Sequence, residues 1–174
     1  MTLPISASKK PITLTLLIIL FAFTANHLKA QSITVSGTNW TVPIETLTEA
    51  GKDYIGTYES PSNQFNLDVT IPLLLGSVTV GATYNEAPHW DDHLKLALRH
   101  TGTGSTLCVL CTITPPGVYK PLTKATSQQI LTITNVLALT KFSMIPIQLK
   151  ASGISVTVPT GTNTATVIFT ISSP

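Results

Sequence analysis

Cys108 and Cys111 are the two cysteines of the chain, and their type and spacing define their chemistry better than those of any other residues. Two cysteines in an oxidising compartment usually form a disulfide. In a regular strand, residues three positions apart are separated by about 10 Å, whereas the Cα atoms of a disulfide are about 4.4–6.8 Å apart. A disulfide therefore requires a turn or bulge at Val109 and Leu110. Two free or intermolecular thiols remain the alternative.

A redox-active role for this cysteine pair is less well supported. A redox-active pair normally begins a helix, whose amino end lowers the pKa of the thiol. Residues 112–116 follow the pair and include two prolines, which cannot continue a helix.

Four polar residues close together, His89, Asp91, Asp92 and His93, form a candidate metal site. Imidazole and carboxylate groups bind zinc or copper. The set has no third histidine at a fixed spacing, and His100 could join it only if the strand folded back. The alternative interpretation is a polar loop that leads into a strand.

Trp40, Trp90 and Tyr84 are candidate ligand-binding residues, because aromatic rings can form a platform on which a sugar stacks. A tryptophan buried between two sheets is the commoner arrangement in β-sandwiches. The chain has no pattern that resembles a nucleophile elbow, a phosphate-binding loop or a catalytic carboxylate pair. We therefore expect a protein that is not an enzyme and that needs no cofactor.

The first 30 residues have the order of a secretory signal peptide. Lys9 and Lys10 precede an apolar run over residues 14–23, and Ala30 is suitably placed for cleavage. A membrane anchor is the alternative, but the run is shorter than the roughly 20 residues that a spanning helix needs. We therefore predict a signal peptide over residues 1–30 and one secreted or cell-surface domain, periplasmic or external, over residues 31–174.

Removal of the signal peptide changes the charge balance of the chain. Lys9, Lys10 and Lys29 leave with it, so that seven basic residues remain against eight acidic ones. The excess of positive charge belongs to the signal, and nucleic acid is not an expected partner. The mature chain has no second apolar stretch long enough to span a membrane.

Apolar and polar residues alternate in several segments bounded by Gly, Pro, Ser and Asn, which is typical of half-buried strands. In the final segment this alternation predicts that Val167, Phe169 and Ile171 are buried. Residues 107–113 are apolar and β-prone, and residues 118–122 fit a short edge strand. Residues 127–139 combine helical spacing with many Thr and Ile residues, so that strand or irregular structure is favoured over helix. The alternating segments are residues 33–35, 40–42, 65–71, 78–83, 94–99, 145–150, 154–158 and 165–171.

The pattern predicts an all-β fold, an antiparallel β-sandwich of immunoglobulin-like or pilin-like type with about seven to nine short strands. Several stretches also resemble known proteins: residues 33–37 and 40–42 after the signal, the middle segments 48–51 and 94–99, and the closing segments 153–159 and 165–171. Together they are similar to uncharacterised small secreted β-sandwich proteins of Bacteroidetes-type bacteria. The final hairpin is also similar in style to spore coat protein U and fimbrial subunits, although the chain lacks the early cysteine, paired with a distant one, that many such subunits have.

This resemblance implies a surface or fibre role with no catalytic residues. We therefore expect a structural or adhesion protein that associates with itself or with other surface proteins by strand addition, in which an exposed strand edge pairs with another strand. An extracellular carbohydrate-binding module is the first alternative, and a metal-binding envelope protein is the second.

Overall fold

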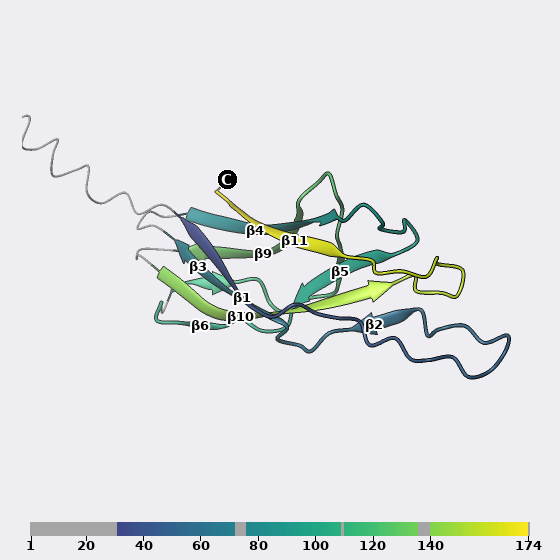
Figure 1. The fold of residues 1–174 in the computed structure, drawn as a ribbon. Coiled ribbons are helices and arrows are strands. Elements are labelled where there is room, and N and C mark those ends of the chain that lie inside the picture. The colour runs from purple at the N-terminus through teal and green to yellow at the C-terminus, as the bar shows by residue number, and fades with distance from the viewer. Residues whose placement is uncertain (1–30, 72–75, 109, 136–139, 174) are drawn as a thin grey trace, which may run out of the picture. The chain divides into compact units, whose positions relative to one another are not determined.

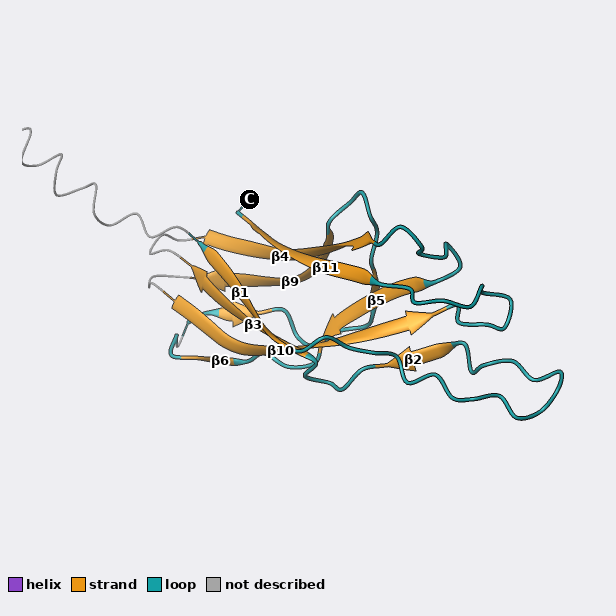
Figure 2. Cartoon of the chain, viewed as in Figure 1, coloured by secondary structure: helices purple, strands orange, loops and turns teal. Residues whose placement is uncertain are grey.

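Two antiparallel sheets make up the folded part of the chain (Figure 1). The structure is a computed structural model that describes residues 31–71, 76–108, 110–135 and 140–173. In these residues it contains strands and loops but no helix (Figure 2). The strands are β1 (Ser32–Gly37), β2 (Thr57–Glu59), β3 (Phe65–Ile71), β4 (Gly76–Glu86), β5 (Lys95–His100), β6 (Ser105–Thr106), β7 (Thr112–Ile113), β8 (Lys120–Pro121), β9 (Gln128–Asn135), β10 (Thr140–Ser152) and β11 (Ala165–Ser172).

The larger sheet has the strand order β1-β3-β10-β5-β8, and the short strands β2 and β6 also pair with β10. The smaller sheet has the order β11-β4-β9-β7. Every pairing is antiparallel. The prediction of an all-β, sandwich-like fold is confirmed.

The core lies between the sheets and is built by residues of alternating parity. In β3, Leu67, Val69 and Ile71 are buried, while Asn66 and the other intervening residues are partly exposed. Buried side chains of β4, β5, β9 and β10, together with Leu122, complete the same cluster, and its described members lie within residues 31–174. Residues 31–174 form one compact unit. The unit therefore has its own hydrophobic core.

Strand β10 is the longest strand and contains a β-bulge. The pairing register with β3 shifts between Phe142 and Ile145, and both of these side chains are buried although they are three positions apart. Met144 lies in the bulge with a φ of 58°, and its backbone N–H donates to the Asp68 carboxylate at 2.9 Å. The bulge thus turns Met144 outward and places two large side chains in the core.

Two predicted strands are loops in the structure, namely residues 40–42 and 154–158. Ile154 is buried in a small second cluster with Tyr58, Leu94 and Ala151, which explains part of the apolar pattern. The backbone around Ser155 is held by a side chain instead of by a neighbouring strand, because the Asp53 carboxylate accepts hydrogen bonds from Ser155 Oγ and Val156 N. Of residues 127–139, for which strand or irregular structure was favoured over helix, residues 128–135 form the strand β9. Residues 136–139 lie outside the described residues.

The final strand, β11, has the predicted alternation, but its inward side chains are less buried than expected. Val167, Phe169 and Ile171 pack against the main core and remain partly exposed. The prediction that they are buried is wrong in degree, because β11 is an edge strand with a partner on one side only.

We expect Phe142→Ala to lower the free energy of unfolding by about 3–5 kcal/mol, because it empties a fully buried site. Phe169→Ala should cost roughly half as much, since Phe169 already has part of its surface in water. Thr170→Ala, on the exposed face of the same strand, is the control and should cost less than about 1 kcal/mol. Urea denaturation of the three variants measures these differences. Equal costs for Phe169→Ala and Thr170→Ala would contradict the inward orientation of Phe169.

Candidate functional site

Cys108 and Cys111 form a disulfide, with their Cα atoms 5.4 Å apart. The chain therefore reverses between them, as a disulfide at this spacing requires. The pair lies between β6 and β7, and Thr106 Oγ1 accepts a hydrogen bond from the backbone N–H of Cys108 at 3.2 Å. Cys111 packs partly against the main core, whereas Leu107 and Leu110 are exposed. Val109 lies outside the described residues.

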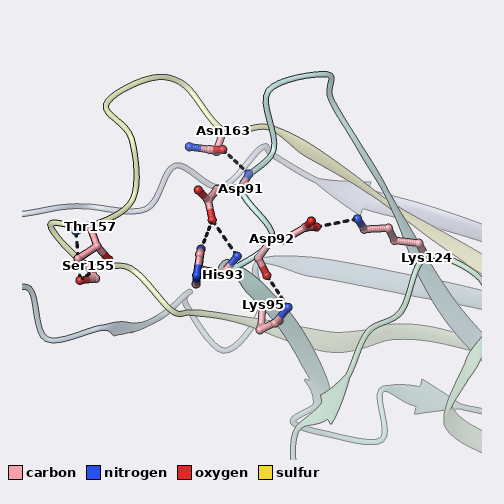
Figure 3. Close-up of polar contacts among 8 residues, drawn as sticks. All are labelled: Asp91, Asp92, His93, Lys95, Lys124, Ser155, Thr157 and Asn163. Atoms are coloured by element: carbon pink, nitrogen blue, oxygen red, sulfur yellow. Dashed lines mark hydrogen bonds and ion pairs between the residues drawn. The ribbon is translucent and has the colours of Figure 1, made fainter.

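Of the candidate metal ligands, Asp91 and His93 contact each other, whereas Asp92 contacts Lys124 (Figure 3). Asp91 Oδ1 accepts a hydrogen bond from His93 N and lies 2.8 Å from His93 Nδ1. These two contacts with His93 hold the pKa of the Asp91 carboxyl below its usual value. Asp92 belongs to a different group and forms an ion pair with Lys124 at 3.2 Å. His89 is exposed.

Most of these polar side chains are engaged in ion pairs or hydrogen bonds within the protein. Lys124 also forms an ion pair with Glu86, and the hydrogen bond with that carboxylate raises the pKa of Lys124. His100 is buried in β5, where its Nδ1 lies 3.3 Å from the carbonyl oxygen of Gly102. In the part of the chain that the structure describes, no three His, Cys, Asp or Glu side chains are grouped as metal ligands.

The candidate ligand-binding aromatic residues belong to the core more than to the surface. Tyr84 is buried, and its ring centroid lies 5.8 Å from that of Trp90 at a tilted angle. Trp40 and Trp90 are partly buried, and both pack against the two hydrophobic clusters. The three rings therefore do not offer an exposed platform for a sugar.

A groove of about 480 Å³ lies beside Trp90, and it is lined by His89, Asp91 and residues 159–163. The indole Nε1 of Trp90 is buried and has no hydrogen-bond partner among the described residues. Asn163 Oδ1 accepts a hydrogen bond from Asp91 N at 3.0 Å, which ties the two sides of this groove together (Figure 3).

Tyr119 lies in a polar cluster that the sequence did not reveal. The Arg99 guanidinium and the Lys150 ammonium lie 4.5 and 4.4 Å from the centroid of its ring. Burial of the phenol, together with the nearby Glu59 carboxylate, raises the pKa of Tyr119 to about 12. A phenol with this pKa stays protonated at neutral pH and cannot serve as a general base. The four residues come from four separate segments, so that no local spacing could have predicted the cluster.

The edges of the two sheets differ in how they are protected against pairing with another strand. On one side, β8 consists of Lys120 and Pro121, and β7 has two residues with prolines 115 and 116 just beyond it. Short strands, lysine and proline are the usual means of blocking an edge. This side of the fold is therefore protected.

On the other side, β1 and β11 are longer edge strands without this protection. Ser32–Gly37 and Ala165–Ser172 contain neither proline nor a charged residue. The two strands lie close together where β1 begins and β11 ends, and Ser173 Oγ donates a hydrogen bond to Gln31 Oε1 there at 2.8 Å. The β1/β11 side, defined by these two strands, is the candidate functional site for a protein that works by strand addition.

Comparison with known proteins adds no further information on function. No protein family model matches the chain, and no curated protein or solved structure matches it either. Within the described residues, there is no helix of the length and hydrophobicity that crossing a membrane requires.

Tyr119 should ionise at a higher pH than an unperturbed tyrosine, in a late phase of the titration. Its folded-state pKa of about 12 lies above the ordinary value of 10.0, so that its stabilising effect is present below pH 10 and is lost between pH 10 and about pH 12. Ultraviolet absorbance of tyrosinate measures the titration. Tyr119→Phe should remove the late phase; a late phase that persists in this variant would assign it to another tyrosine.

Replacing both cysteines with serine should cost little stability, about 2 kcal/mol or less, because the loop that the disulfide closes is very short. Thermal melts of the Cys108→Ser/Cys111→Ser variant measure this cost. Mass spectrometry of the denatured parent, alkylated without reduction, provides the matched check and should show no added label. Labelled parent protein would show that the disulfide is absent in solution.

Proposed function

We propose that this chain is a non-enzymatic structural or adhesion protein, secreted or held at the cell surface, that associates by strand addition along its β1/β11 side. The observation that supports this proposal is β11, an edge strand of eight residues without charge or proline. Its unpaired backbone groups form a ready template for another strand. The partner is a second copy of the chain or another surface protein, and repeated addition would build a fibre.

The contrast between the two sides of the fold supports the same conclusion. One side of the fold is protected against pairing with another strand by lysine and proline residues, namely Lys120, Pro121, Pro115 and Pro116. The same residue types could have blocked the β1/β11 side, but they are absent from its strands. Because β11 is neutral, two copies pairing through it bring no like charges together. An open edge that is this long also carries a risk of aggregation, which is tolerable where pairing is useful.

The alternative functions have weaker support in the geometry. A carbohydrate-binding module needs exposed rings, whereas Tyr84 is buried and Trp90 is partly buried against the core. A metal-binding protein needs converging ligands, whereas Asp91 and Asp92 are engaged with different partners. Strand addition requires only the edge that the fold leaves open.

We expect the purified protein to self-associate as its concentration rises, and Thr166→Lys/Thr170→Lys to weaken this association about tenfold or more. The two lysines would place like charges along both copies of β11. Thr79→Lys is the matched control, because Thr79 lies on β4 in the same sheet with partner strands on both sides. Sedimentation velocity measures the association. A parent protein that stays monomeric and binds no surface protein, or a control that is equally impaired, would contradict the proposal.

A further inference from the structure

One end of the folded unit, here called the β6 end, combines exposed apolar side chains with an almost complete lack of charge. Strands β3 and β9 finish at this end, with Ile71 and Asn135 as their last residues, and β4 and β10 begin there. Strand β6 lies beside the beginning of β10, with Thr106 paired to Phe142 (Figure 1). The loop that carries the disulfide follows β6 directly.

The apolar residues of the β6 end are unusually exposed. Leu107 is 100% exposed and Leu110 is 64% exposed, and they lie on either side of Cys108, with Cys111 next along the chain. Met144, which the bulge in β10 turns outward, is 57% exposed. Single exposed apolar residues are common. A leucine whose whole side chain is in water would, however, gain free energy of transfer if a binding partner buried it.

Charged side chains are concentrated away from the β6 end. Residues 31–174 contain seven basic and eight acidic residues. Of these fifteen, Asp68 and Lys141 lie near the β6 end, and they form an ion pair with each other at 2.8 Å. The others lie on the middle of the larger sheet or towards the opposite end, and residues 72–75 and 136–139 add none to the sequence.

The opposite end also has exposed apolar residues, but they lie among charges. Ile55 and Val156 are 76% and 55% exposed. The Asp53 carboxylate accepts a hydrogen bond from Val156 N, and this bond lowers the pKa of Asp53, which stays ionised at neutral pH. Moving these residues into an apolar medium would require removing water from a carboxylate, which is costly. At the β6 end the Asp68 carboxylate accepts a hydrogen bond from Met144 N in the same way, but there the negative charge is already paired with Lys141.

We propose that the β6 end contacts a lipid bilayer, with Leu107 and Leu110 inserted at the boundary between headgroups and acyl chains. This inference goes beyond the proposed strand addition, which uses a different surface. The leucines are exposed to solvent, so that they suit a medium that deforms around them. The disulfide holds the loop closed before contact, which lowers the entropic cost of insertion.

The point at which the chain enters the folded unit agrees with an orientation in which the β6 end faces the membrane. Ser32 pairs with Thr70, so that residue 31 joins the folded unit at the β6 end. Any form of the protein that retains the apolar run over residues 14–23 would be tethered through the same end. The seven basic residues form no cluster at this end, so that binding depends on apolar insertion and not on attraction to anionic lipids.

Flotation of the chain from Gln31 onward with neutral phosphatidylcholine vesicles tests the proposal, since this part has its own core. The parent should float with the vesicles, and added salt should not release it. Leu107→Ser/Leu110→Ser should lower the partition coefficient about tenfold or more. Ile55→Ser/Val156→Ser, with two exposed apolar residues removed at the opposite end, is the matched control and should bind as the parent does.

A Leu107→Trp variant gives an independent readout of depth. Its fluorescence should shift to shorter wavelength with vesicles and be quenched by lipids brominated in the acyl chains, beyond any change in the parent. A parent that does not float, a double leucine variant that binds fully, or a Leu107→Trp variant whose added fluorescence is not quenched would each overturn the proposal. Loss of self-association in the double leucine variant without any vesicle binding would assign the β6 end to a second copy and would overturn it too.

Discussion

The backbone pairing of β10 is the constraint on which the larger sheet depends. This strand pairs with β3 and β2 on one side and with β6 and β5 on the other. Between the β3 and β2 pairings, Ser60 fills the gap: its N–H donates to the Leu149 carbonyl, and its hydroxyl oxygen accepts from Leu149 N. Buried Gln148 then donates to the Ser60 carbonyl and accepts from Arg99. Backbone groups buried along β10 thus find partners even where no strand lies alongside.

Alternation in the sequence predicted burial more reliably than it predicted hydrogen bonding. Residues 65–71 were predicted correctly because β3 has strands on both sides and one face on the core. Residues 154–158 alternate too, yet Ile154 is buried by loop packing and Asp53 supplies the bonds that a partner strand would supply. The cysteines were identifiable by type, whereas the Tyr119 cluster depends on tertiary pairing that no local pattern records.

The two proposed contacts use surfaces that differ in physical character. The β1/β11 side offers backbone groups along an uncharged edge, and its partner must therefore be a strand. The β6 end offers exposed apolar side chains, and the partner proposed for it is therefore an apolar medium. Strand addition along the first surface would leave the second free, so that an array of copies at a membrane could use both at once.

The pairing of β11 with β4 joins the last strand of the chain to one that precedes it by roughly eighty residues or more. Until the ribosome has released the carboxyl-terminal residues, β4 lacks one of its neighbours, and the inner face of the smaller sheet remains incomplete. Topologies dominated by such distant pairings fold slowly. A nascent chain would therefore remain unfolded for longer, and a premature stop codon that removed only the final strand would leave β4 as an unpaired edge of the smaller sheet.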